Sequence, residues 1–192
     1  MRVSREQAAA NKERVIELAG QLFRERGFEG IGVADLMASA GLTHGGFYRQ
    51  FESKNDLVVQ ACDRTLQTSV DRWHETVARE PETALVKIIN RYLSEHARDV
   101  PSDSCALTSL AGEVPRQNNA ALTEAFTRAL KGFADALARV GPEATAEERY
   151  QQALTRLAGL VGAVILARTV SDPALSDEIL AAARKGLTGP LG

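Results

Sequence analysis

Cysteine and histidine are scarce in this chain, and their scarcity excludes whole classes of protein. The 192 residues include two cysteines and three histidines. Cys62 and Cys105 lie far apart in the sequence, form no Cys-x-x-Cys pair and have no histidine at metal-ligand spacing. This pattern argues against a disulfide framework and a zinc site, and it fits a reducing compartment. We expect no metal site, no cofactor and a cytoplasmic location.

Long apolar runs and an excess of one charge are also missing. The longest apolar run, residues 157–167, is much shorter than the roughly 20 residues needed to cross a bilayer, and the N-terminus shows no signal-peptide core. We therefore expect no membrane association. The formal net charge is −2, and residues 1–62 contain eight basic and eight acidic side chains. Because nucleic-acid binders often carry a basic domain, any DNA contact here must depend on the arrangement of residues.

Strand patterns are absent as well. No run of β-branched residues alternates with a period of two, and the prolines stand at segment boundaries, so almost the whole chain is predicted to be helical. We predict an all-α fold of about nine helices, with a three-helix head at residues 1–53 and a helical body at residues 54–192. The expected helices span about 4–26, 33–40, 43–49, 54–78, 82–98, 105–114, 118–140, 146–170 and 173–187.

Capping residues support several of these boundaries. Ser4 with Gln7 and Ser53 with Asp56 predict capping boxes at the starts of the first and fourth helices. Asp172, followed by proline, predicts the start of the last helix.

The arrangement of the first helices, long, short and short with a Gly-Leu turn between the short pair, is typical of a helix-turn-helix. In this motif the last helix lies in the major groove of DNA. Thr43 and His44 stand at its N-terminus, where side chains reach base edges and free N–H groups meet phosphate. Gly45 and Gly46 each cost about 1 kcal/mol of helix propensity. They leave room for DNA to approach the backbone.

Cationic and phenolic side chains follow these glycines. Tyr48 and Arg49 are predicted to contact phosphate oxygens. Lys54 falls in the first turn of the next helix, where the helix dipole disfavours a cation unless an anion binds nearby. Phe47 and Phe51 are interpreted as core. The alternative is a compact three-helix unit with glycine turns and no role in DNA binding, and spacing alone does not decide between the two.

The segment GLTHGGFYRQFESKNDL, residues 41–57, resembles the signature of the TetR/AcrR family of transcriptional regulators, as does its lead-in at residues 19–30. Two positions depart from the family pattern. Gly32 replaces the usual Thr or Ser at the N-cap of the second helix, where glycine is also acceptable, and Arg49 replaces a common His. The matching positions are Thr43, Gly45, Tyr48, Phe51, Ser53 and Lys54.

This resemblance implies a ligand-responsive regulator, by family habit a repressor, that binds a near-palindromic double-stranded operator as a homodimer. It also implies that residues 54–192 form a ligand-binding and dimerisation body. Two other functions remain as alternatives. One is a helical interaction module without DNA binding, and the other is a small enzyme, although no catalytic triad, metal motif or nucleotide-binding motif is recognisable.

Apolar side chains surround most of the predicted helix 146–170 and form a stripe on the last helix. The resemblance implies that these two helices dimerise, and two such pairs can build a two-fold four-helix interface. Burial inside the monomer is the alternative. The expected interface residues are Leu157, Leu160, Val161, Val164, Ile165, Leu175 and Ile179.

Bulky or titratable residues of the middle helices are candidates for an effector pocket, although aromatics at helical spacing are ordinarily core. Residues 104–107 and 110–114 resemble the branch of the family that contains the N-ethylmaleimide-responsive repressor, in which a cysteine at this place senses electrophiles. We expect the helix start to lower the thiol pKa of Cys105; the alternative is a small buried hydrophobe. The effector would be a small molecule or an electrophile. The candidates are Trp73, Tyr92, His96, Cys105, Phe126 and Phe133.

Overall fold

Every regular element of the chain is a helix in the computed structural model, which describes residues 5–141 and 145–189. This confirms the predicted all-α class. No helix within these ranges is long and apolar enough to span a membrane. The elements are α1 Arg5–Arg26, α2 Val33–Ser39, η1 His44–Arg49, α3 Lys54–Arg79, α4 Pro81–Tyr92, α5 Glu95–Asp99, η2 Pro101–Asp103, α6 Ala106–Leu110, η3 Val114–Arg116, α7 Ala120–Ala138, α8 Ala146–Thr169 and α9 Pro173–Thr188.

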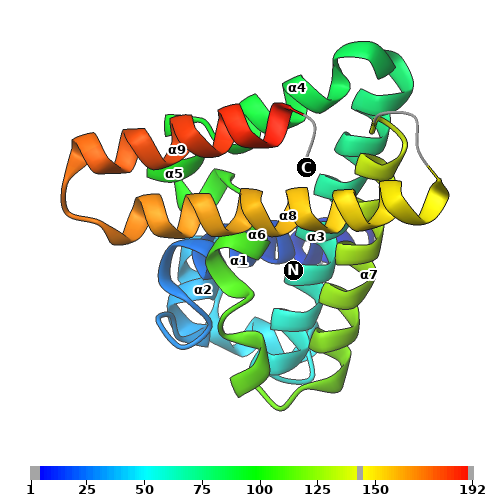
Figure 1. The fold of residues 1–192 in the computed structure, drawn as a ribbon. Coiled ribbons are helices and arrows are strands. Elements are labelled where there is room, and N and C mark those ends of the chain that lie inside the picture. The colour runs from blue at the N-terminus through cyan, green and yellow to red at the C-terminus, as the bar shows by residue number, and fades with distance from the viewer. Residues whose placement is uncertain (1–4, 142–144, 190–192) are drawn as a thin grey trace.

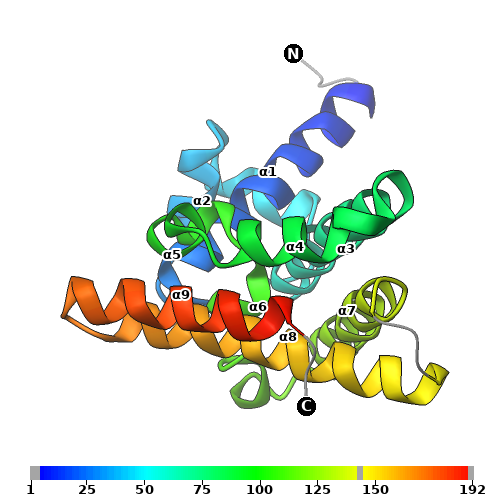
Figure 2. The ribbon, with the colours of Figure 1, turned by 45° about the horizontal axis from the view of Figure 1, so that its top comes forward.

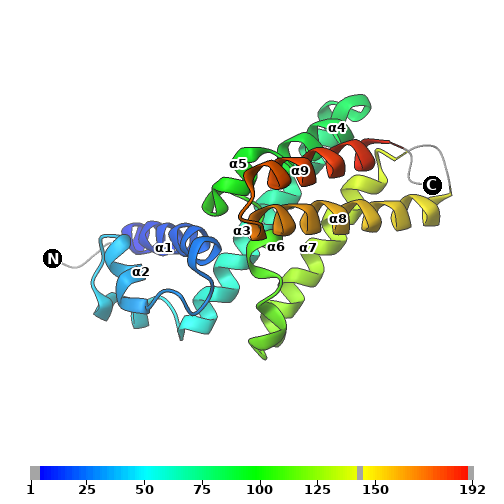
Figure 3. The ribbon, with the colours of Figure 1, turned by 60° about the vertical axis from the view of Figure 1, so that its left-hand side comes forward.

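Helices α1 and α2 and the 3-10 helix η1 form a small head that projects from the body (Figure 3). Phe23, Met37 and Phe47 are buried in its centre. Gly27 and Gly41 both have positive φ, at 74° and 68°, because the chain must leave α1 and α2 through the left-handed region that glycine adopts most easily. The predicted cap at Ser4 lies outside the described residues.

Helix α3 runs from the head into the body, so it packs on α1 near one end and on α7 along its length (Figure 3). It starts as predicted, since Ser53 Oγ accepts the backbone N–H of Asp56 at 3.1 Å. The Asp56 carboxylate accepts the backbone N–H of Glu52 and not that of Ser53, so the reciprocal bond is shifted by one residue from a standard capping box.

Helices α8 and α9 lie side by side and cover one face of the body (Figures 1 and 2). Asp172 caps α9 through its carboxylate and Pro173 opens it, as predicted. The two helices approach closely at Gly159, where a Cβ would lie 2.9 Å from Leu187 Cδ2. Arg156, although buried, donates to the Leu187 carbonyl at 3.3 Å and so ties α8 to the end of α9.

Three predicted helices differ from those observed. The helix expected at 82–98 is broken, because Ser94 Oγ accepts the Ala97 N–H and donates to the Arg91 carbonyl, which ends α4 and starts α5. The helix expected at 105–114 ends at Leu110, just before a glycine turn and Pro115. The third helix of the head is a 3-10 helix that contains the two adjacent glycines.

Candidate nucleic-acid interface and candidate ligand pocket

The 3-10 helix η1 is held by one side chain and presents the others to solvent. Phe47 is buried and packs at 5.3 Å, between ring centroids, against Phe51. Thr43, His44 and Arg49 are exposed, and Tyr48 is 66% exposed. Thr43 occupies the N-cap position, but its side chain makes no capping hydrogen bond. Its hydroxyl is therefore available to an outside partner.

Neither glycine of η1 is required by the chain itself. Gly45 and Gly46 have no positive φ, so another residue could adopt their backbone conformation. A Cβ at Gly45 would meet nothing within 4 Å, and one at Gly46 would make only ordinary contacts, the nearest at 3.6 Å to Met37 Cε. The backbone at Gly45 and Gly46 is therefore open to close approach by a binding partner.

Lys54 lies in the first turn of α3, as predicted, and has a carboxylate partner in the free protein. Its Nζ is 3.5 Å from Glu29 Oε2. The Lys54 side chain is 25% exposed, whereas that of Glu29 is 81% exposed. Because the Glu29 carboxylate of this pair is open to solvent, the pair contributes little stability, so a phosphate can replace the carboxylate at small cost.

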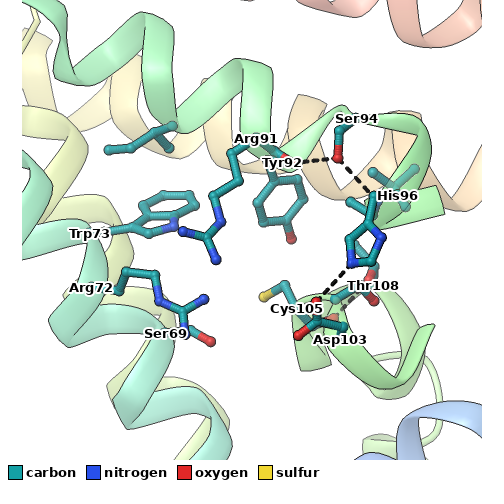
Figure 4. A pocket seen from close by; sticks show the side chains of 14 residues that line it. Ser69, Arg72, Trp73, Arg91, Tyr92, Ser94, His96, Asp103, Cys105 and Thr108 are labelled. Atoms are coloured by element: carbon teal, nitrogen blue, oxygen red, sulfur yellow. Dashed lines mark hydrogen bonds and ion pairs between the residues drawn. The ribbon is translucent and has the colours of Figure 1, made fainter. Parts of the chain in front are cut away.

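A cavity of about 110 Å³ lies between α3, α4 and the segment that leads into α6 (Figure 4). Four of the six predicted pocket residues line it: Trp73, Tyr92, His96 and Cys105. The Trp73 and Tyr92 rings meet edge to face with centroids 5.8 Å apart. His96 Nε2 is 2.7 Å from the Asp103 carboxylate at the rim, and this bond holds the pKa of Asp103 below its usual value.

The structure does not bring the two predicted phenylalanines into this cavity. Phe133 is fully buried behind Trp73, with ring centroids 4.6 Å apart, and acts as core that supports the indole. Phe126 lines a separate apolar groove of about 590 Å³ with residues of α7 and α8.

Among the lining residues that sequence reasoning missed are two arginines, Arg72 and Arg91. Each precedes one of the lining aromatics directly, as Arg72-Trp73 and Arg91-Tyr92. The repeated Arg-aromatic pair was a usable signal. The crossing of α3 and α4, which brings the two pairs together, was not visible in the sequence.

The expectation of a lowered thiol pKa at Cys105 is wrong. Cys105 is the N-cap of α6, and backbone N–H groups of Leu107 and Thr108 do favour the thiolate. Desolvation by burial is larger, however, and raises the pKa of the Cys105 thiol. Burial raises the pKa of Cys62, which lies in the core, to about 12. Neither cysteine is a resting thiolate.

The predicted interface residues of α8 and α9 fall into three groups, which are buried, exposed and half-buried. Leu157, Leu160 and Val164 are buried inside the protomer, where they pack the core, and Leu157 also lines the groove that contains Phe126. This corrects our assignment, which took an apolar circumference as one surface. Ile165 and Leu175 are 41% and 43% exposed. Val161 and Ile179 are half-buried.

Comparisons of sequence agree with this geometry. Residues 15–61 match the family described as bacterial regulatory proteins, tetR family. The HTH-type transcriptional repressor DhaR of Mycobacterium sp. (strain GP1) is 26% identical over 116 residues, which cover 59% of this chain and 57% of that protein. Three curated relatives are matched over 27%, 38% and 57% of their own lengths.

Solved structures share the fold over almost the whole chain. Escherichia coli NemR in its reduced form matches with a TM-score of 0.78 at 20% identity, covering 93% of this chain and 95% of that one. FadR from Bacillus subtilis in complex with stearoyl-CoA matches with a TM-score of 0.60 at 19% identity, covering 91% and 98%. The family match falls on the head, where η1 is exposed as the motif requires. Residues 15–61 therefore carry the helix-turn-helix domain of the TetR family of bacterial regulatory proteins, and the fold of the chain is similar to that of solved TetR-family regulators.

Proposed function

We propose that the protein is a ligand-responsive repressor that binds a near-palindromic operator as a homodimer. The observation that carries this proposal is the η1 surface, on which Gly45 leaves open space and Thr43, His44 and Tyr48 are exposed around a buried Phe47. Thr43 and His44 would read base edges, while Tyr48, Arg49 and Lys54 would bind phosphates. Because bacterial DNA lies in the cytoplasm, we place the protein there.

Exposed apolar side chains on α8 and α9 support the homodimer. Residues at helical spacing on α8 and α9 form a stripe that solvent would not favour, and contiguous apolar surface of this kind marks an interface. Gly162 and Gly186 share the spacing of the stripe, and a Cβ at either would meet nothing within 4 Å, so a second copy can approach closely. The stripe comprises Leu154, Ala158, Val161, Ile165, Leu175 and Ile179.

Two contacts between head and body support a ligand response. Arg24 of α1 donates to the carbonyl of Ser102, which directly precedes the cavity-lining residues Asp103 to Cys105. On the other side of the head, the Phe28 N–H donates to the Glu113 carboxylate at 3.0 Å. A ligand that shifts the segment 102–105 would shift α1 with it. Such a ligand favours the state that does not bind DNA, and the coupling must be reciprocal.

A gel-shift assay on the intergenic DNA beside the gene tests the proposal. We expect a sequence-specific complex that weakens steeply with salt, because phosphate contacts release counterions. Absence of a complex at low salt, with folded protein, would overturn the proposal.

The sharper test is Gly45→Ala with Gly112→Ala as its matched control. Both glycines have open space at the Cβ position and no positive φ. Each substitution is therefore expected to preserve or raise stability, by about 0.4–1 kcal/mol. Only Gly45→Ala should weaken the operator complex, because only its methyl group enters the DNA surface. Equal operator affinity in both variants would contradict the assignment of η1.

A further inference from the structure

Two arginines face one another across the open side of the cavity. Arg72 reaches in from α3 and Arg91 from α4, in front of the Trp73 ring (Figure 4). Within the part of the chain that the structure describes, neither guanidinium donates a hydrogen bond or forms an ion pair. Like charges that point toward each other repel. An anion bound between the two guanidinium groups would offset this repulsion.

The negative charge available from the protein is already engaged. Asp103 is the one carboxylate among the residues that line the cavity, and it binds His96 at 2.7 Å. The positive charges of Arg72 and Arg91 also lower the pKa of Asp103, but neither arginine forms an ion pair with it. The neighbouring Asp99 is held by Arg98 at 2.6 Å.

Outside the cavity the charges are balanced. A second hollow of about 300 Å³ shares Arg72, Trp73, Ile88 and Arg91 with the cavity, so the arginine pair stands between the two spaces. The other charged residues of this hollow are paired, Arg79 with Glu75 at 3.9 Å and Lys87 with Glu80. The excess positive charge is therefore located at Arg72 and Arg91.

Behind the cavity wall lies a further cation without a carboxylate contact. Arg168 donates to the carbonyls of Arg98 and Ala97 at 2.9 Å and 2.6 Å and to Ser104 Oγ at 2.8 Å. These acceptors are neutral, so they satisfy the donors without cancelling the charge. The field inside the cavity is consequently positive.

Tyr92 supplies an independent indication of a ligand. Its hydroxyl is buried and points into the cavity beside the Cys105 thiol, a weak acceptor with which it interacts, and it makes no hydrogen bond of ordinary geometry among the described residues (Figure 4). An unsatisfied buried hydroxyl is unfavourable, so a ligand atom that accepts a hydrogen bond from it would bind well there.

The size and shape of the cavity restrict the ligand. At about 110 Å³ its inner space is somewhat smaller than a cavity of about 150 Å³ that holds benzene, so it has room for at most one ring, with the charged group of the ligand at the open side between Arg72 and Arg91. Its walls include the edge-to-face rings of Trp73 and Tyr92, which suit a flat body. A bidentate anion suits a pair of guanidiniums.

We propose that the cavity binds a small aromatic carboxylate, with its carboxylate between Arg72 and Arg91, its ring against Trp73, and a polar ring substituent toward the Tyr92 hydroxyl. This inference rests on the proposed function, in which the cavity holds the effector. A phosphate monoester presents the same chemistry to the arginines, and the experiment separates the two.

Trp73 makes the experiment direct, because it is the single tryptophan of the chain and lines the cavity. Its fluorescence is titrated in the full-length protein with sodium benzoate, phenyl phosphate and the uncharged analogue benzamide at constant ionic strength. We expect a saturable change with benzoate, and an affinity for benzamide lower by about tenfold or more. Phenyl phosphate that binds more tightly than benzoate would overturn the carboxylate assignment.

Substitutions locate the site. Arg72→Gln and Arg91→Gln, both at exposed residues, should each weaken benzoate binding about tenfold without loss of fold. Arg79→Gln, on the same helix as Arg72 but paired with Glu75, is the matched control and should bind as the parent does. Tyr92→Phe should weaken 4-hydroxybenzoate more than benzoate.

Equal affinity for benzoate and benzamide, or no saturable change with any compound, would overturn the inference. The gel-shift assay keeps this outcome distinct from failure of the proposed function. If the protein binds DNA but not benzoate, only the ligand class is wrong. If it binds benzoate but no DNA, the repressor proposal is wrong and the anion site stands.

Discussion

Arg24 Nε donates to the backbone carbonyl of Ser102 at 2.9 Å and thereby joins the DNA-binding head to the segment that lines the cavity. The same guanidinium donates to Thr65 Oγ1 of α3 at 3.2 Å. One side chain from the last turn of α1 thus contacts both the helix that connects head and body and the loop beside the pocket. This makes it the most direct physical link between the two proposed sites.

We predict that Arg24→Ala uncouples the cavity from the head. Reciprocity requires that operator DNA changes the cavity if the cavity controls the head, so operator binding should alter Trp73 fluorescence in the parent protein. The response should be much smaller in Arg24→Ala, which also loses about 1–3 kcal/mol of stability through an unsatisfied carbonyl. Arg26→Ala, at an exposed residue nearby, is the control. A full fluorescence response in Arg24→Ala would exclude this route.

Local features of the fold could be predicted because they depend on neighbouring residues. Ser53, Asp172 and Gly41 determine where helices begin and end through hydrogen bonds and backbone conformations spanning only a few positions. The candidate DNA contacts of η1 could be named for the same reason, since they are adjacent in sequence.

Features that depend on how helices cross were not predictable. Periodicity marks α8 as apolar around most of its circumference, but it cannot say that Leu160 faces the core and Ile165 faces outward. Likewise Arg72 and Arg91 meet only because α3 and α4 pack together. The predicted direction of the Cys105 pKa shift was wrong. The position of Cys105 at a helix start can be read from neighbouring residues, whereas its desolvation is caused by residues that are distant in sequence.

Lys54→Ala and Tyr48→Phe should weaken binding to all DNA sequences alike. Both residues are assigned to phosphates. Loss of the Lys54 cation lowers the slope of log affinity against log salt by about 0.9, whereas loss of the neutral Tyr48 hydroxyl weakens binding and leaves the slope unchanged. Fluorescence anisotropy over a salt series measures this slope. Lys131→Ala, at an exposed residue of α7, should leave it unchanged. If Lys54→Ala changed base preference and kept the slope, the residue would contact bases.

Glu29→Gln should have the opposite effect on DNA affinity. Glu29 is the carboxylate 3.5 Å from Lys54 Nζ, and its removal frees the cation for phosphate. An exposed pair is worth at most about 1 kcal/mol, so we expect up to about a fivefold gain in affinity by anisotropy. Weaker binding by Glu29→Gln would show that the pair positions Lys54 for DNA.

Ile165→Glu should convert the proposed homodimer into monomers and abolish binding to the full operator. A charge buried at an interface without a partner is strongly unfavourable, and each monomer would contact only one half-site. Val86→Glu on α4 is the matched control, since Val86 is 45% exposed and Ile165 41%, and it should remain dimeric. Sedimentation velocity measures the association state. A dimer that survives Ile165→Glu would place the interface elsewhere.

Thiol labelling tests the electrostatic environment of Cys105. Its folded-state pKa is raised by burial, and the thiolate is the reacting species, so iodoacetamide at pH 7 should modify Cys105 more slowly in folded than in unfolded protein. The labelling rate should increase as the pH rises above about 8.5, the ordinary value for cysteine.

The raised pKa of Cys105 also makes the free energy of unfolding depend on pH. Because the folded pKa is raised, the neutral thiol stabilises the fold fully at pH values below the unfolded pKa, and this contribution is lost as the pH rises through the folded pKa. Urea unfolding across this alkaline range should therefore show a loss of stability that is smaller in Cys105→Ala.

In the labelling experiment, peptide mapping by mass spectrometry separates Cys105 from Cys62. Faster labelling of Cys105 in the folded protein than in the unfolded protein at pH 7 would mean that the fold stabilises the thiolate, and it would restore the cysteine as a direct electrophile sensor.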